Sequence, residues 1–156
     1  IGSSTQDTHD GLASTDRSQE EFQANEFAVF QAGIDAGADM IMVGHVSAPA
    51  LTGDNTPCSL SKAVITDILR DQMNYKGVII SDALDMSAIS EYYSSEQAAV
   101  MALKAGCDML LMPENFQEAY EGVIQAVADG TISEERINDS LRRIYRIKYA
   151  NKITAE

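Results

Sequence analysis

Residues that bind metals or cross-link chains are scarce in this sequence. Its 156 residues include two cysteines, Cys58 and Cys107, and two histidines, His9 and His45. Two thiols make no disulfide framework, and neither cysteine has the spacing of a metal-ligand pair. Cys107 directly precedes an apolar run, where a small buried side chain is its usual role. A metal site built from histidine and cysteine is therefore not expected.

Positive charge and long apolar stretches are also lacking. The chain has 11 Lys and Arg against 24 Asp and Glu, which gives a formal net charge of −13. Non-specific binding to nucleic acid or to an anionic membrane needs a basic surface, so neither partner is expected. No apolar run approaches the roughly 20 residues of a membrane span, and no signal peptide is recognisable. The length suits one domain with a sizeable core.

Helical and strand-like segments alternate along the chain. Residues 1–17 are polar and aperiodic, which predicts a loop. Apolar spacing predicts a helix from residue 18 to about 36, and the apolar run 39–45 predicts a parallel strand buried on both faces. The remaining expected elements are a helical stripe at 60–69, a strand at 78–80, a helix capped by Ser94 or Ser95 and ending at Gly106, a strand at 109–112, a helix capped by Asn115, and a last helix capped by Ser133. This order predicts a parallel α/β sheet.

Two segments of the chain resemble each other. Residues 36–42 (AGADMIM) match residues 105–111 (AGCDMLL) at an offset of two β/α units. The match indicates a repeating β/α architecture, with chance similarity between apolar strands as the alternative. Three strands cannot close an eight-stranded barrel, so the chain is either an open sheet or a piece of a barrel.

Polar side chains follow the predicted strands. In either architecture ligands bind outside the carboxyl ends of parallel strands, where His45, Asp82 and Glu114 lie. Asp82 follows a β-branched strand, and a carboxylate there is costly unless it is paired, hydrogen-bonded or facing a cleft. The alternatives are a capping role for Asp82 and a hydrogen-bonded structural role for His45.

A second polar group lies in the opening loop. Asp7 and His9 are two residues apart, so the carboxylate can hold one ring nitrogen and leave the other for proton transfer. An ordinary polar loop can contain the same pair without any catalytic role.

Five segments, taken in order, resemble glycoside hydrolase family 3. They are residues 36–46 (AGADMIMVGHV), positions within 59–70 (SLS, VI and LR), 77–86 (GVIISDALDM), 105–113 (AGCDMLLMP) and 130–137 (GTISEERI). The chain is most similar to the bacterial β-N-acetylhexosaminidase branch.

The resemblance implies a fold and a domain organisation. The catalytic domain of this family is a TIM-type (β/α)8 barrel, and the chain resembles its C-terminal portion of about three βα units. Residues 1–17 correspond to the remnant of a catalytic loop, and residues 18–156 to βα units six to eight and a terminal helix. The family's Lys-His-Phe-Pro-Gly-His-Gly segment and the earlier strands have no counterpart here. The resemblance therefore implies a part of a longer enzyme that is inactive by itself.

The resemblance also implies a reaction and its residues. Asp82 corresponds to the nucleophile, His9 to the acid/base with Asp7 as its partner, and His45 and Met112 to sugar-binding positions. The implied reaction is retaining hydrolysis of terminal β-linked N-acetylglucosamine, with no metal or organic cofactor. The implied substrates include sugars derived from the bacterial cell wall, and relatives occur both in the cytoplasm and outside the cell.

Three other interpretations remain open at this point. One is a β-glucosidase of the same family, which takes its acid/base residue from a second domain. Another is a non-catalytic half-barrel that forms homo-oligomers through its exposed edges. The third is an open-sheet ligand-binding domain.

Overall fold

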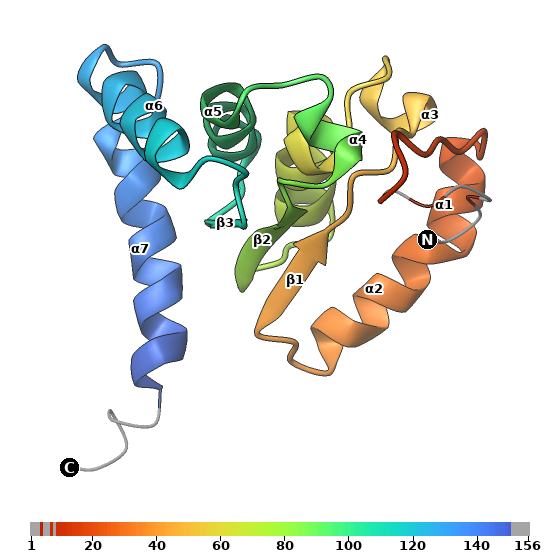
Figure 1. Ribbon diagram of the computed structural model, residues 1–156. Helices are drawn as coiled ribbons and strands as arrows, with labels where there is room; N and C mark the ends of the chain where they lie inside the picture. Colours follow the sequence, from red (N-terminus) through yellow and green to blue (C-terminus); the bar gives the residue numbers. More distant parts are fainter. Residues whose placement is uncertain (1–3, 5–6, 8, 151–156) are drawn as a thin grey trace.

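The protein is an α/β fold built on three parallel strands (Figure 1). The computed structural model describes Ser4, Asp7 and residues 9–150. Its strands are β1 (Met40–Val43), β2 (Val78–Ala83) and β3 (Met109–Leu111), in the order β1-β2-β3. Both neighbouring pairs are parallel, which confirms the predicted sheet.

Helices connect the strands and follow them. The longer helices are α1 (Gln19–Ala24), α2 (Glu26–Asp35), the π-helix η2 (Ala63–Gln72), α5 (Ser95–Ala105), α6 (Phe116–Ala128) and α7 (Glu134–Tyr149). Three short ones are α3 (Pro49–Thr52), the 3-10 turn η1 (Cys58–Leu60) and α4 (Ser87–Ser90). None of the helices within the described residues is long and apolar enough to cross a membrane.

Local side-chain chemistry sets the beginnings of three helices as predicted. The Ser94 hydroxyl accepts from the backbone N–H of Gln97 in a reciprocal capping box at α5. Asn115 caps α6 and Ser133 caps α7 in the same way, each accepting from a backbone N–H in the first turn. Such a cap satisfies a donor that has no partner inside the helix.

The helix predicted from residue 18 to about 36 is divided in two. Ser18 caps α1 as a capping box, but the backbone of Asn25 is distorted from regular helix geometry, with φ −118° and ψ −79°. The Asn25 side chain donates to the backbone carbonyl of Glu21 at 2.8 Å. Asparagine competes with the helix for backbone groups in this way, so the chain turns and α2 begins again at Glu26.

The strand at 39–45 was predicted to be buried on both faces, and this prediction is wrong for β1. Ile41 and Val43 are buried, whereas Met40 and Met42 are 43% and 48% exposed. The main core lies on the Ile41 side, where residues of η2 and α5 pack against the sheet. Within the described residues no comparable layer covers the two methionines.

The third strand is shorter than its apolar run. The pattern predicted a strand through Met112, but β3 ends at Leu111. Met112 has a φ of +44°, in the left-handed region, so it cannot continue an extended strand.

Candidate active site

Asp82 is presented near the carboxyl end of β2. Its neighbour Ser81 is fully buried, and the Ser81 hydroxyl accepts from the backbone N–H of Leu111 at 3.1 Å. Alternation along the strand puts Asp82 on the other face, the face of the exposed Met42. The Asp82 side chain is half-buried, and its Oδ1 accepts from the backbone N–H of Ala83 at 2.9 Å. Asp82 therefore has a local hydrogen bond and also faces the uncovered side of the sheet.

His45 lies two residues beyond β1 and is entirely buried. Its Nε2 is 2.8 Å from the backbone oxygen of Ala83, and its Nδ1 is 2.6 Å from the hydroxyl oxygen of Ser59. A carbonyl can only accept, so Nε2 carries the proton and Nδ1 accepts from Ser59. Burial lowers the pKa of His45 and favours the neutral ring. The hydrogen bond to Ala83 and the nearby Asp82 and Asp85 carboxylates oppose this effect.

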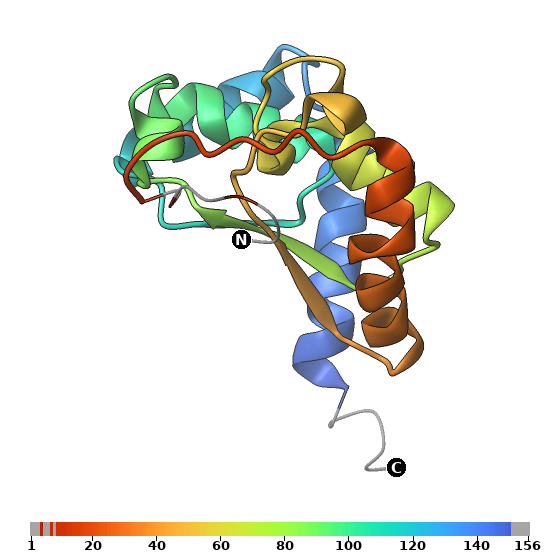
Figure 2. The same ribbon diagram turned by 90° about the vertical axis from the view of Figure 1, so that its right-hand side faces the viewer.

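The opening loop is attached to the carboxyl end of β1. The backbone N–H of Thr15 donates to the carbonyl of Ser47 at 3.0 Å, and the N–H of Ser47 donates to the carbonyl of Ala13 at 2.8 Å. Figure 2 shows this segment, in red, running from the start of α1 toward the loop after β2. Leu12 there shares a cavity of about 460 Å³ with Ala88 of α4. The loop is thus held over the ends of two strands.

Asp7 and His9 form a hydrogen-bonded dyad in this loop. His9 Nδ1 lies 2.6 Å from Asp7 Oδ1, and the backbone N–H of His9 donates to the same oxygen at 2.9 Å. The Asp7 side chain raises the pKa of His9, and the backbone and side chain of His9 lower the pKa of Asp7. The charge of Asp82 adds to the rise at His9, so the dyad lies within electrostatic range of Asp82. Both dyad side chains are exposed.

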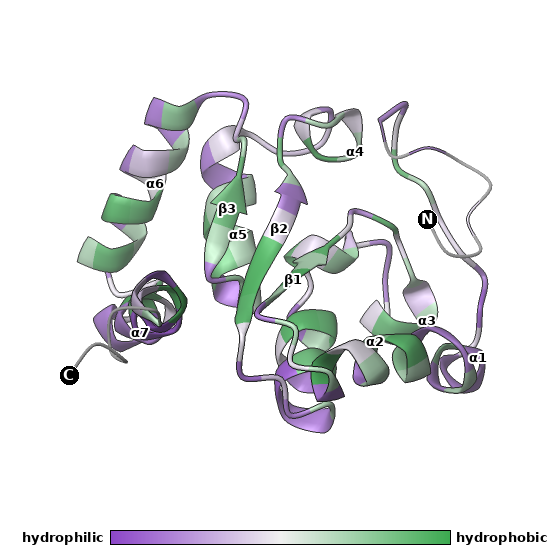
Figure 3. Ribbon diagram, turned by 90° about the horizontal axis from the view of Figure 1, so that it is seen from below, coloured by the Kyte–Doolittle hydropathy of each residue, from purple (hydrophilic) through white to green (hydrophobic). Residues whose placement is uncertain are grey.

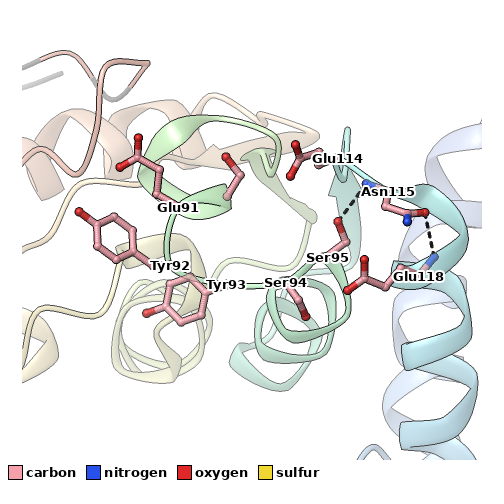
Figure 4. Close-up of a pocket in the computed structure, with 9 residues that line it drawn as sticks. Glu91, Tyr92, Tyr93, Ser94, Ser95, Glu114, Asn115 and Glu118 are labelled. Carbon is pink, nitrogen blue, oxygen red and sulfur yellow. Dashed lines mark hydrogen bonds between the residues drawn. The ribbon is translucent and has the colours of Figure 1, made fainter.

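Met112 and Glu114 lie beyond the end of β3. Met112 is 58% exposed and has a left-handed backbone. Glu114 lines a cavity of about 620 Å³ together with Tyr92 and Tyr93 from the connection between α4 and α5 (Figure 4). Asp82, His9, His45 and Met112 are not among the residues that line it. This cavity therefore lies beside the predicted site.

Two groups of interacting polar side chains were not found from the sequence. One is Ser59, the partner of His45, which lies 14 residues further along the chain. The other surrounds the buried Asp108 at the amino end of β3, opposite the end that carries Asp82. Asp108 forms ion pairs with Arg70, Arg136 and Arg143 and accepts hydrogen bonds from the Ser140 hydroxyl and the Ile79 N–H. The sequence signal was the repeated AG-x-D segment, which identified the position but not its partners.

No group of three or more His, Cys, Asp or Glu side chains among the described residues is arranged to hold a metal ion. The polar side chains at the carboxyl ends of β1 and β2 include the Asp82 carboxylate and the Asp7–His9 carboxylate–imidazole dyad.

Comparisons with known proteins show the family to which the chain belongs. Residues 1–147 match the family described as "Glycosyl hydrolase family 3 N terminal domain". A β-hexosaminidase of Stenotrophomonas maltophilia is 39% identical over 125 residues, which cover 78% of this chain and 36% of that protein. A "Beta-N-acetylglucosaminidase/beta-glucosidase" of Cellulomonas fimi is 30% identical over 140 residues, covering 84% of this chain and 25% of that protein.

Solved structures show the same relationship. A family 3 β-N-acetylglucosaminidase from Paenibacillus superposes with a TM-score of 0.92 at 35% identity, covering 98% of this chain and 30% of that one. The chain thus spans about a quarter to a third of the length of these relatives. It belongs to glycosyl hydrolase family 3, within the family's N-terminal domain.

Proposed function

We propose that this chain is the C-terminal portion of a catalytic (β/α)8 barrel that hydrolyses terminal β-linked N-acetylglucosamine. Residues 1–17 would be the remnant of the catalytic loop, and residues 18–156 would be βα units six to eight with the terminal helix. The observation that carries the proposal is the Asp7–His9 dyad, held by an anchored loop within electrostatic range of Asp82. The printed activities of the similar proteins give the sugar class.

The proposed reaction proceeds with retention in two steps. The Asp82 carboxylate attacks the anomeric carbon while His9 gives its proton to the departing glycosidic oxygen. The resulting glycosyl ester on Asp82 is hydrolysed when the neutral His9 takes a proton from the attacking water. Asp7 stabilises the protonated ring and leaves Nε2 for the proton transfer. A His–Asp dyad thereby takes the place of the usual second carboxylic acid.

Met112 and His45 occupy the neighbouring strand ends. The exposed Met112 side chain at the end of β3 offers an apolar contact for the sugar. His45 contacts the site from the protein interior, because its ring is buried and binds the backbone carbonyl of Ala83. These steps need only proton transfer and a nucleophile, so the proposed reaction uses no metal or organic cofactor.

The nucleophile can be identified by trapping. In the longer enzyme that joins this chain to its remaining barrel units, a fluorinated N-acetylglucosamine analogue should label Asp82, as read by peptide mass spectrometry. Asp82→Asn should abolish the label and lower turnover by orders of magnitude. Asp85→Asn is the matched control, because Asp85 is exposed three residues later and should leave labelling intact. A label on Asp85 or Glu114 would contradict the assignment.

The chain alone should lack turnover, because the remaining barrel strands and their substrate contacts are outside it. The test is release of the aryl group from an aryl N-acetylglucosaminide by the 156-residue chain and by the longer enzyme. Turnover by the chain at a comparable rate would contradict this part of the proposal.

A β-glucosidase activity is the second candidate, because one similar protein carries both activities in its name. The longer enzyme should prefer the aryl N-acetylglucosaminide to the aryl glucoside. A higher kcat/KM for the glucoside would reverse the assignment.

A further inference from the structure

We propose that His45 and Ser59 are positioning residues that hold the backbone beside Asp82, and that His45 does not itself bind the sugar. This inference rests on the proposed function, because it assigns a role at the same nucleophile. His45 has no exposed surface, and both of its ring nitrogens already have protein partners.

Three hydrogen bonds form one chain that ends at the nucleophile. The Ser59 hydroxyl donates to His45 Nδ1 at 2.6 Å, and His45 Nε2–H donates to the Ala83 carbonyl at 2.8 Å. The N–H of the same Ala83 donates to Asp82 Oδ1 at 2.9 Å. His45 thus binds the carbonyl of Ala83, and Asp82 binds the N–H of the same residue. The bond from His45 therefore limits the backbone rotation of Ala83.

The pairing of the strands explains why such a support is needed. β1 pairs with β2 only as far as Val43 and Ser81, so Ala83 lies beyond the last partner that β1 provides. On its other side Ala83 pairs with Leu111 of β3, after an irregularity in the register between Ile80 and Ala83. The His45 imidazole supplies the donor that a longer β1 would have supplied from its backbone.

The buried surroundings of His45 also keep its imidazole ring in one tautomer. Ser59 and His45 are both fully buried, and Ser59 fixes the proton on Nε2 by donating to Nδ1. A neutral donor can hold the Ala83 carbonyl without placing a positive charge against the nearby Asp82 carboxylate. Misplacing a reacting group by about 1 Å costs roughly a hundredfold in rate, which sets the size of the expected effect.

Paired substitutions of His45 in the longer enzyme test the inference. The Nε2 of glutamine can take the place of the ring Nε2, whereas asparagine is too short to reach Ala83. His45→Asn should lower kcat about a hundredfold with KM changed by less than about threefold. The kcat of His45→Gln should be at least tenfold higher than that of His45→Asn. A raised KM with kcat retained would show direct sugar binding and overturn the inference, as would equal losses in both variants.

Ser59→Ala tests the other end of the chain of hydrogen bonds. It removes the donor to Nδ1 and should lower kcat with KM retained. Ser61→Ala is its control, because Ser61 is also buried and is not the partner of His45. An unchanged kcat in Ser59→Ala would contradict the role of Ser59.

A spectroscopic measurement needs no variant, so it tests the hydrogen bonds of His45 even if the substituted proteins fail to fold. Long-range 1H–15N correlation of the 156-residue chain should show the Nε2–H tautomer for His45. A proton on Nδ1 would overturn the inference. The two proposals fail separately. If Asp82 is not labelled in the unmodified enzyme, its assignment as the nucleophile is wrong. If Asp82 is labelled at the unmodified rate in His45→Asn, only the positioning role is wrong.

Discussion

The pKa values of the two histidines are shifted in opposite directions, and each shift has a local cause. The hydrogen bond that the His9 ring donates to Asp7 raises the pKa of His9 above 6.5, whereas burial lowers the pKa of His45 below it. Because the pKa of His9 is raised, the stabilisation from its ion pair with Asp7 is fully present below the ordinary histidine pKa. It is lost as the pH rises through the raised pKa of His9. An NMR titration of the ring protons should give a midpoint above 6.5 for His9, and Asp7→Asn should lower it. A midpoint at or below 6.5 in the unmodified chain would contradict the dyad.

Removal of His9 should affect substrates unequally. In the longer enzyme, His9→Ala should slow alkyl N-acetylglucosaminides by about 10²–10⁴-fold, because their leaving oxygen needs a proton. Activated aryl glycosides need little protonation and should lose far less. The comparison of kcat/KM for the two substrate types is the measurement, and equal losses on both would argue against His9 as the acid.

The cysteines should be unreactive in the folded chain. Burial raises the pKa of Cys58 to about 11 and that of Cys107 to about 12. The thiolate is the reactive form, and it is a minor species at pH 8 for both residues. An aromatic disulfide reagent should modify neither thiol in native protein and both in denaturant. Rapid modification of the native chain would show that the two sites open readily.

At the scale of the elements, Asp108 joins α7 and η2 to the sheet. Its side chain is fully buried among Arg70, Arg136 and Arg143. Removing the carboxylate leaves buried positive charge without a partner, which typically costs about 3–5 kcal/mol. Asp108→Asn should therefore lower the free energy of unfolding by about that amount, as measured in urea.

Asp39 provides the matched control for this substitution. It holds the same place in the repeated segment as Asp108, but it is exposed. Asp39→Asn should change the free energy of unfolding by less than about 0.5 kcal/mol. Similar losses at the two positions would contradict the role assigned to the buried ion pairs.

The elements show which structural features can be predicted from sequence. The caps Ser94, Asn115 and Ser133 could be predicted because each acts within three residues of itself. The break at Asn25 and the π-helical winding of η2 could not, because apolar spacing looks the same across them. The uncovered face of β1 escaped prediction because local spacing does not reveal which layers pack on a strand.

The contacts of the candidate site likewise include some that the sequence predicts and some that it does not. The Asp7–His9 contact joins residues two apart, so the motif itself predicts it. The contact between His45 and Ala83 spans 38 positions and depends on how β1 and β2 pair. A sequence can place His45 at a strand end, but only the fold shows that its ring turns inward.

At the scale of the whole molecule, apolar side chains lie exposed on β1, α6 and α7, and Figure 3 shows hydrophobic residues on the strands and along α6. The exposed large apolar residues include Met40 and Met42 on β1, Phe116, Tyr120 and Ile124 on α6, and Leu141, Tyr145 and Tyr149 on α7. The outer strands β1 and β3 also have one neighbour each in the described sheet. Surfaces and edges of this kind favour association.

The isolated chain should therefore self-associate. Light scattering after size exclusion should give a mass above 16.9 kDa that rises with concentration. Met40→Lys with Met42→Lys should weaken the association, because charge on the exposed strand face opposes pairing. Lysines at the exposed Gln19 and Glu20 of α1 serve as the control. A compact monomer at every concentration would contradict the prediction.

The ion pairs of Asp108 have a consequence for biosynthesis. Arg143 follows Asp108 by 35 residues, so β3 leaves the ribosome well before the helix that neutralises its carboxylate. At translation rates of about 5–20 residues per second, the delay is roughly two to seven seconds. During that interval Asp108 has Arg70 as its available partner, because Arg70 precedes it in the chain. The ion pairs of Asp108 with Arg136 and Arg143 can therefore form only after α7 has been synthesised.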